Sequence, residues 1–489
     1  MIPYRVSQVR QIGPARLTAG LDRYRRLDLN AHYSVHEQVP NATVDEIIGM
    51  AEEVDMRGRG GAGFPFARKI RAVADNARKS DTVVLVNAAE GEPASMKDKT
   101  LLTRAPHLVL EGALMAASAL GSREVVIAVP AGELAEGSVN AAVAERGLQG
   151  YVRVAGIEER FVSGEGGALI RAVNGEPSGL PPGRKQRSSD VGVDGLPTLL
   201  SNTETYAQLA ILAEIGPQAY ASAGTLQEPG TTLLSVSGAV KATSVIEIAP
   251  GIPFAAVLDM CEADVGDGVL VGGYHGKWIT RQAAYSATCS RQGLKEVGGE
   301  LGAGIIVPLS PDTCPLGEVL RVARYLAAQS SGQCGPCRLG LPDLASALAD
   351  VIEGDPDAIE LVERVAGAVK GRGACFHPDG TSRFVLSALE AFNGDVQEHL
   401  LHGTCGRKVK ELLPLPIKNE VDVRLVVDWT RCQGHGLCAH LVPDLVKLDT
   451  HGYPVFMDGG IPSWQRSAAQ KAVEMCPALA LRIGGGGDA

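Results

Sequence analysis

The chain has 489 residues, of which 45% are hydrophobic and 21% charged, so it can form several domains with buried cores and is not a disordered polymer. Its formal net charge of -10 argues against nucleic acid as a main partner. No run of about eighteen uncharged apolar residues predicts a membrane span, and the first ten residues lack the apolar core of a signal peptide. We therefore expect a cytoplasmic protein without direct membrane insertion.

Residues 57–69 form a glycine-rich, basic stretch. Four of the six residues that begin at Gly58 are glycines, and glycine readily adopts the positive φ angles that turn successive N–H groups toward an anion. Arg57, Arg59 and Lys69 add positive charge. Because a strand-like run follows at residues 82–86, we interpret the stretch as an anion cradle rather than a flexible surface loop.

Short β-branched runs alternate with helical stretches between residues 82 and 155, which predicts an α/β layer with a mostly parallel sheet. Ligands of such sheets bind at the carboxyl ends of the strands. The polar segment 87–93 directly follows the first strand, so we expect it to face a ligand, with a plain strand-to-helix turn as the alternative. The predicted strands are 83–86, 125–129 and 151–154, and the clearest predicted helix is 108–120.

The middle of the chain is first rich in strands and then in helices. Alternating and apolar runs predict strands at 232–240 and 268–273, with a helix at 253–262 between them. From residue 318 to residue 392, apolar residues keep helical spacing over four segments, which predicts a bundle of four helices.

Seven of the ten cysteines fall between residues 334 and 476, and in a reducing cytoplasm this distribution favours metal ligation over disulfides. Cys334 and Cys337 lie at the junction of two predicted helices, and Cys375 follows at a distance. This set favours an iron–sulfur cluster, with a zinc site or no cluster as the alternatives. Three cysteines have no motif around them and are expected to be buried thiols. They are Cys261, Cys289 and Cys405.

A compact unit begins near residue 421, after the proline-rich boundary at 412–416. Its predicted elements are a strand at 421–429, a helix at 468–475 and a strand at 480–483. Its cysteines lie in a glycine-rich loop, at Cys432 and Cys438, and before a proline, at Cys476.

These motifs resemble those of the NADH-oxidising, FMN-bearing subunit of respiratory complex I and of related soluble diaphorase subunits. The resemblance covers residues 44–392, and the unit after residue 421 resembles a small bacterial single-cluster ferredoxin. It implies a multidomain α/β and α+β fold. The implied parts are an N-terminal lead-in (1–40), a Rossmann-like FMN and NAD(P)H domain (41–228), a β-grasp domain (229–310), a four-helix iron–sulfur bundle (311–412), a linker (413–420) and a ferredoxin-like domain (421–489).

The resemblance also implies site residues in the first domain, carried by residues 58–69, 87–93, 161–170 and 197–205. Residues 161–170 are expected to form a strand, a turn and a helix. Phe64 is expected to stack on the NADH adenine, and Glu165 to lie beside nicotinamide and flavin as the catalytic-site residue. The implied cofactor contacts are Gly58, Arg59, Gly60, Gly61, Phe64, Lys69, Asn87, Glu90, Glu92, Gly164, Ser201 and Asn202.

The family pattern is broken at several of these positions. Ala89 and Gly166 replace acidic residues, and Leu180 replaces a lysine in the loop 177–189, where Arg184 or Lys185 could substitute. The choice between NADH and NADPH therefore stays open.

The cluster sites depart from the family pattern as well. Cys334, Cys337 and Cys375 match three family ligands, and Ser331 stands at the first position. This implies a serine-ligated or three-iron cluster, or a fourth ligand from elsewhere, with His377 and Cys314 as candidates. In the ferredoxin unit His435 takes the place of the second cysteine, beside Cys432, Cys438 and Cys476. A 3Fe-4S cluster is implied, or a 4Fe-4S cluster with His435 or an exogenous ligand on the odd iron; a zinc knuckle is the alternative.

The expected activity is that of a diaphorase-type NAD(P)H dehydrogenase. Electrons would pass from NAD(P)H through FMN and an internal cluster to the fused ferredoxin, and then to an unidentified redox protein or redox complex, including one at a membrane. A non-catalytic electron-transfer or docking subunit of a larger redox complex is a second reading. A third is the reverse reaction, in which ferredoxin reduces NAD(P)+.

Overall fold

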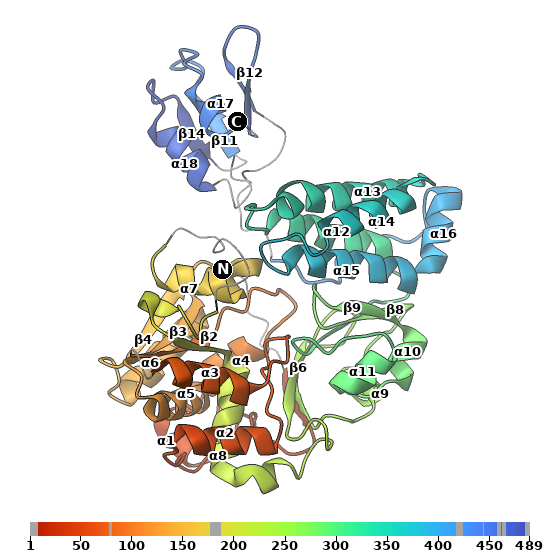
Figure 1. The fold of residues 1–489 in the computed structure, drawn as a ribbon. Helices are drawn as coiled ribbons and strands as arrows, with labels where there is room; N and C mark the ends of the chain where they lie inside the picture. Colours follow the sequence, from red (N-terminus) through yellow and green to blue (C-terminus); the bar gives the residue numbers. More distant parts are fainter. Residues whose placement is uncertain are drawn as a thin grey trace.

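The computed structural model describes residues 8–77, 81–176, 187–416, 424–443, 445–456, 461 and 466–484. Leu180, Arg184 and Lys185 lie outside the described residues. Figure 1 shows an α/β unit, a second sheet beside it, a layer of helices above that sheet, and a small C-terminal unit at the top. Helices pack on sheets or on other helices throughout, as the predicted multidomain α/β fold requires.

The first unit is built on a parallel sheet in the order β4-β3-β2-β5. Along β2, Val84 and Val86 pack with helices α5 and α8, whereas Val83 and Leu85 pack with Leu169 of α7 on the other face. Burial of both faces explains the unbroken apolar runs in the sequence. The strands are β2 (Val83–Asn87), β3 (Glu124–Pro130), β4 (Val152–Ile157) and β5 (Thr198–Asn202).

Helices and short turns surround this sheet. The predicted strand at the start of residues 161–170 is instead a 3-10 turn, η1 (Phe161–Gly164), because the turn is closed by hydrogen bonds of its own rather than by a sheet neighbour. The other elements are α1 (Leu29–Tyr33), α2 (Val44–Glu53), α3 (Phe66–Ala77), α4 (Lys97–Arg104), α5 (Pro106–Leu120), α6 (Leu134–Glu145), α7 (Gly166–Val173), η2 (Val193–Gly195) and α8 (Thr203–Tyr220).

The second unit is a six-stranded mixed sheet in the order β1-β7-β6-β10-β8-β9. Its edge strand β1 (Gln8–Ile12) comes from the segment that was expected only to lead in, and it pairs in parallel with β7. The remaining strands are β6 (Thr232–Val236), β7 (Ser244–Ile248), β8 (Gly268–Val271), β9 (Lys277–Thr280) and β10 (Ile305–Pro308). The helices are α9 (Phe254–Met260), α10 (Arg281–Ser286) and α11 (Arg291–Glu296).

The third unit is a helical bundle with one helix more than the four predicted. The helix stripes pack around a common core, as their spacing predicts. The helices are α12 (Pro315–Ala328), α13 (Leu341–Glu353), α14 (Ala358–Val369), α15 (His377–Ala391) and α16 (Asn393–His402), with the π-helical turn η3 (Pro336–Gly340) before α13.

Residues 405–413, which we call the strap, return from α16 to the start of α12. Glu318 of α12 is fully buried and accepts hydrogen bonds from the N–H groups of Lys410 and Leu412 at 3.0 Å and of Leu413 at 3.3 Å. Since backbone amides need acceptors when they are taken out of water, this side chain helps to fix the path of the strap.

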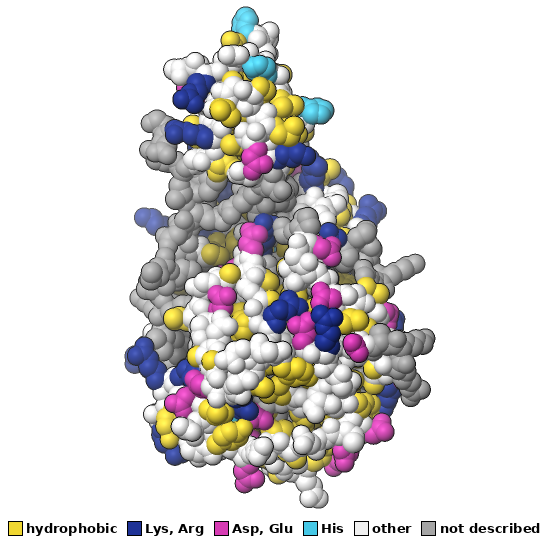
Figure 2. Space-filling model, turned by 90° about the vertical axis from the view of Figure 1, so that its left-hand side faces the viewer, with side chains coloured by type: hydrophobic (Ala, Val, Ile, Leu, Met, Phe, Trp, Pro, Cys, Tyr) yellow, Lys and Arg dark blue, Asp and Glu magenta, His cyan; other side chains and the backbone are white. Residues whose placement is uncertain are grey.

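The C-terminal unit has its own small core. It combines β11 (Arg424–Val427), paired antiparallel with β14 (Leu481–Gly484), with α17 (Leu437–Leu441), α18 (Arg466–Glu474), β12 (Val446–Leu448) and β13 (Pro454–Phe456). In Figure 2 the histidine side chains on the visible face gather on this unit. None of the helices in the described part of the chain combines the length and apolar character needed to cross a bilayer.

Candidate functional site

A cavity of about 520 Å³ opens at the carboxyl ends of β2 and β5. The two strands are paired in register, so that Asn87 and Asn202 end side by side at this edge. The glycine stretch, the segment 87–92 and the turn at 164–165 line one side. The second sheet and the bundle line the other through His275, Ala303 and Cys375, so all three units meet here.

The glycine stretch presents a row of free N–H groups at this cavity. Among the described residues, none accepts a hydrogen bond from the N–H groups of residues 60–63. Gly61 has a φ of +108°, a conformation that side-chain-bearing residues rarely adopt. The loop is closed by the bridge between Arg57 and Pro65. Unpaired amides held by a closed loop suit the phosphate of a cofactor, as the sequence predicts.

The cations of the stretch are engaged elsewhere. The Arg59 guanidinium donates to the carbonyl of Thr231 at 3.2 Å and lies 3.9 Å from Glu204. Lys69 donates to the carbonyl of Leu200 at 2.8 Å, and burial lowers its pKa to about 8. Arg59 also lines the cavity, and contact of Arg59 and Lys69 with a cofactor stays a prediction.

A buried ion-pair network that the sequence analysis missed supports the floor of the cavity. The ammonium of Lys97 lies 2.9 Å from Glu204 and 3.0 Å from Asp98. The side chain of Asn202 joins the network by donating to Asp98. Burial raises the pKa of Asp98 to about 6 despite the attraction of Lys97. Both Lys97 and Asp98 line the cavity. Their position a few residues after the segment 87–93 is the sequence feature that could have predicted this.

The two acidic residues predicted in the segment 87–93 have different surroundings. Glu90 accepts from the N–H groups of Asp98 at 3.1 Å and Lys99 at 2.9 Å, so it caps the start of α4. Glu92 accepts from the N–H of Tyr274 at 2.9 Å, while its other oxygen is buried without a partner. Burial raises the pKa of Glu92 to about 8, so at neutral pH it is a carboxylic acid that can donate to a ligand.

Replacing Glu92 by glutamine is expected to remove a pH dependence of stability. Between its usual pKa and about 8, the folded protein holds one proton more on Glu92 than the unfolded chain, so this group makes stability fall as pH rises, by up to about 1.4 kcal/mol per pH unit. Urea unfolding at pH 5.5 and pH 8 checks this. E92Q should lose less stability than the wild type over that interval, and an equal loss in both would contradict the assignment.

Three other predicted residues have distinct positions. The Asn87 amide donates to the carbonyl of Gly164 at 2.9 Å and so holds the turn beside the cavity. Glu165 accepts from the N–H of Ala168 at 2.9 Å, as the cap of α7, and is exposed at the cavity rim. Ser201 lies on the opposite face of β5 from Asn202, next to Lys69, because successive strand residues alternate. Its side chain is therefore directed away from the cavity.

Two further predicted cofactor contacts, Phe64 and Gly58, lie outside the cavity lining. Phe64 is 49% exposed and, like Gly58, does not line the cavity. Its stacking on adenine stays a prediction.

Cys334, Cys337 and Cys375 converge at one end of the bundle. Burial raises the pKa of the Cys337 thiol, and the neighbouring thiols of the other two raise it further. The hydroxyl that approaches Cys337 belongs to the fully buried Ser330 rather than to Ser331, the aligned position. Cys375 also lines the large cavity, which brings this set next to the cradle site.

Neither alternative fourth ligand reaches these cysteines. Both ring nitrogens of His377 are engaged, one with the carbonyl of Leu326 at 2.9 Å and one with His275 at 3.0 Å. Cys314 caps the opposite end of α12, a helix about 21 Å long, and its thiol faces His399. The expectation that one of them completes the set is therefore wrong.

The C-terminal unit brings a second set of thiols together. Burial raises the pKa of Cys438, as do the nearby thiols of Cys432 and Cys476. His435 lies in the same loop between two glycines with positive φ, and its side chain is exposed. The convergence of the three cysteines matches the prediction, whereas His435 as a ligand stays a prediction.

Electron transfer between an organic cofactor and iron–sulfur clusters needs a binding site for each group, and this chain combines an anion cradle with two sets of converging cysteines. Comparison with family models supports a flavin site and two iron–sulfur sites. Residues 51–211 match the Nuo51 FMN-binding domain, residues 318–399 the NADH-ubiquinone oxidoreductase-F iron-sulfur binding region, and residues 425–483 the 4Fe-4S single cluster domain. These matches confirm the resemblance to the FMN-bearing subunit of respiratory complex I.

Whole-length relatives point the same way. The chain is 27% identical over 434 residues to an NADH-quinone oxidoreductase subunit of Streptomyces coelicolor, covering 82% of this chain and 95% of that protein. It is 26% identical over 423 residues to the NADH-quinone oxidoreductase subunit of the same kind from Escherichia coli K12, covering 80% and 94%. Among solved structures, an NAD+-reducing [NiFe]-hydrogenase in the air-oxidized state has a similar fold, with a TM-score of 0.71 at 24% identity, covering 81% of this chain and 68% of that one.

Proposed function

We propose that this protein is an NAD(P)H-oxidising flavin and iron–sulfur oxidoreductase whose electrons pass to its own C-terminal ferredoxin unit and then to a separate redox protein. The observation that carries the proposal is the single cavity lined by Gly60 and Gly61 on one side and by Cys375 on the other. A cofactor held at the cradle would thus be a direct neighbour of the cluster ligands. The chemistry that FMN supplies when bound is the conversion of two-electron into one-electron transfer.

The residues that would hold FMN follow from the groups that are free to bind. The amides of residues 60–63 would bind the phosphate, because they have no partner in the described part of the chain. Glu92 would donate from its protonated carboxyl group, and its buried unpaired oxygen fits a polar ligand in the cavity. Asn202 would approach from the carboxyl end of β5. Glu165, at the cavity rim, would lie on the side where the nicotinamide enters.

An iron–sulfur cluster would be held by Cys334, Cys337 and Cys375. The match of residues 318–399 to the NADH-ubiquinone oxidoreductase-F iron-sulfur binding region supports a multi-iron cluster over a zinc site. Ser330 or Ser331 would provide an oxygen at the remaining position. In the C-terminal unit, Cys432, Cys438 and Cys476 would hold the second cluster.

Anaerobic purification followed by visible and EPR spectra tests the proposal. Flavin absorbance should bleach on adding NADH or NADPH, and a cluster EPR signal should appear in the same titration. Comparing the two nucleotides also shows which of them the protein prefers as electron donor. Bound flavin that neither nucleotide bleaches would favour a docking subunit, and protein without flavin, iron and sulfide would refute the proposal.

Replacing Gly61 by alanine is expected to release the flavin. A side chain at a φ of +108° costs about 1–2 kcal/mol, so the loop relaxes and its amide row is lost. This should weaken FMN binding by about tenfold or more, measured by flavin retention on gel filtration and fluorescence titration. Gly137→Ala is the control, because a methyl group there meets nothing within 4 Å. Equal flavin retention in both variants would contradict the cradle.

A further inference from the structure

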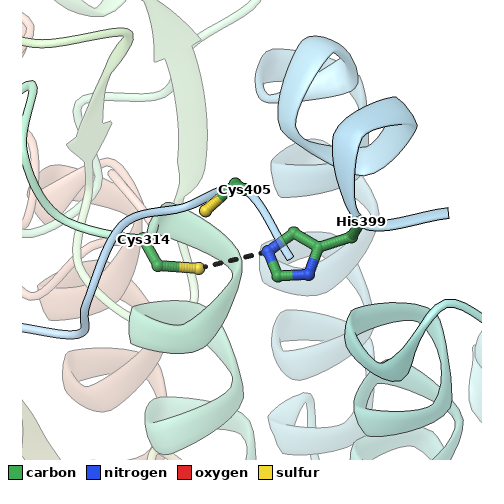
Figure 3. Close-up of side chains that lie close together, drawn as sticks. All are labelled: Cys314, His399 and Cys405. Carbon is green, nitrogen blue, oxygen red and sulfur yellow. Dashed lines mark hydrogen bonds between the residues drawn. The ribbon is translucent and has the colours of Figure 1, made fainter. Parts of the chain in front are cut away.

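A second group of metal-binding side chains lies at the far end of the bundle from the cluster cysteines. Cys314, His399 and Cys405 place one ligand atom each so that all three lie within 4.8 Å of one another. Figure 3 shows the two thiols and the imidazole directed toward a common point from three different segments. The segments are the start of α12, helix α16 and the beginning of the strap.

The imidazole of His399 is set up as a metal ligand. Its Nδ1 lies 2.7 Å from the carbonyl oxygen of Ile352 and must donate, because a carbonyl can only accept. The lone pair is therefore on Nε2, which lies 3.4 Å from the sulfur of Cys314. A carbonyl behind the ring is the usual support of a metal-bound histidine, since it fixes both the tautomer and the orientation of the ring.

The thiol of Cys314 is also held in place. It takes the N-cap position of α12, where Ser, Thr, Asp or Asn is usual, and accepts from the N–H of Gly317 at 3.3 Å. Its own N–H donates to the carbonyl of Lys408 at 3.0 Å, which ties it to the strap.

The spacing of the three atoms fits one ion. A tetrahedral zinc ion with bonds of about 2.0–2.3 Å keeps its ligand atoms about 3.5–3.8 Å apart. The distance of 3.4 Å between Cys314 and His399 is close to that, and the 4.8 Å limit on the other pairs leaves only a small inward movement. Two thiolates and one imidazole are ligands that zinc prefers, and a dication would offset the thiolate charges.

We propose that Cys314, His399 and Cys405 bind a zinc ion that fastens the strap to the start of α12. Cys405 is only partly buried, so solvent reaches the fourth position and a water molecule would complete the tetrahedron. Zinc has no redox chemistry here, so the site takes no part in electron transfer. It would instead stabilise the strap, which leads to the C-terminal unit. It lies apart from both sets of cluster cysteines and does not depend on the proposed flavin function.

Metal analysis of the full-length protein tests the proposal. Protein isolated anaerobically from zinc-supplemented cells should contain about one zinc per chain, in addition to iron. Zinc K-edge absorption should show two sulfurs at about 2.3 Å and one nitrogen at about 2.0–2.1 Å, and the iron clusters do not interfere with an element-specific edge. Cys405→Ala and the double variant C314A/C405A should lose the zinc and keep flavin and iron. Cys261→Ala, which removes a buried thiol of another core, should keep the zinc.

Three results would overturn the proposal. They are wild-type protein without zinc, zinc that persists in the double variant, and a disulfide between Cys314 and Cys405 found by mass spectrometry of the anaerobic protein. Limited proteolysis tests separately whether zinc fastens the strap to the start of α12. Removal of zinc by a chelator should increase cleavage within residues 404–413, and unchanged cleavage would exclude the fastening role.

Discussion

Exchanging Glu204 for glutamine is expected to lower the free energy of unfolding by about 3–5 kcal/mol, the usual cost of removing one charge from a buried ion-pair network. The Glu204 carboxylate is almost fully buried between Lys97 at 2.9 Å and Arg59 at 3.9 Å. Glutamine keeps an oxygen for the N–H of Leu233 but turns its amide group toward the ammonium of Lys97. Because Lys97 borders the cavity, flavin should be lost in the same variant.

Urea unfolding followed by circular dichroism and flavin release measures both effects of Glu204→Gln. Burial would raise the pKa of Glu204, but Lys97 and Arg59 outweigh it and lower the pKa. The group is therefore ionised at neutral pH, and its stabilising contribution is lost as the pH falls through its folded pKa. The cost of the exchange should shrink in acid. Glu53→Gln, at an exposed position of α2, is the control, and a similar small effect in both variants would refute the network's role.

Replacing Cys337 by alanine, which has no ligand atom, is expected to abolish electron transfer beyond the flavin. Cys337 is the most buried thiol of its set, and its loss should remove the iron and sulfide of one cluster. NADH-dependent reduction of a one-electron acceptor should fall by at least about 100-fold, the upper end of what changes outside the ligand shell produce. Bleaching of the flavin by the nucleotide should persist, because the cradle lies in another unit.

Iron and sulfide analysis, EPR and stopped-flow spectroscopy check the Cys337→Ala prediction. Cys289→Ala is the matched control, since Cys289 is fully buried in the core of the second sheet, away from both cysteine sets. It should retain iron and turnover. Full iron content in C337A, or equal turnover in the two variants, would place the cluster elsewhere.

Most of the helices and strands could be predicted from local sequence patterns. The buried strands β2, β3 and β4 and the amphipathic helices of the bundle lie where periodicity predicts them, within a few residues. Strand β1 was missed because a five-residue edge strand acquires its pairing only from β7, more than 230 residues later. Helix α16 was missed because the spacing of apolar residues does not indicate that the chain turns at Phe392 and starts another helix.

Predicting the site depended on whether its geometry is local. Asn87 and Asn202 come together because parallel strands end at the same edge, a rule that applies without coordinates. The reverse rule, alternation along β5, separates Ser201 from Asn202. The engagement of Arg59 by Glu204, and the approach of Cys405 to Cys314, join residues about 90 or more positions apart. Such contacts arise from packing and leave no periodic signal.

The fixed path of the strap sets a limit on how far the C-terminal unit can travel. Glu318 anchors the amides up to Leu413, and Pro416 and Arg424 are only eight residues apart, a span of at most about 29 Å. A tether this short corresponds to a local concentration in the millimolar range. Under the proposed function, a freely diffusing carrier would have to reach that concentration to compete with the C-terminal unit for electrons, so lengthening residues 417–423 should favour outside acceptors.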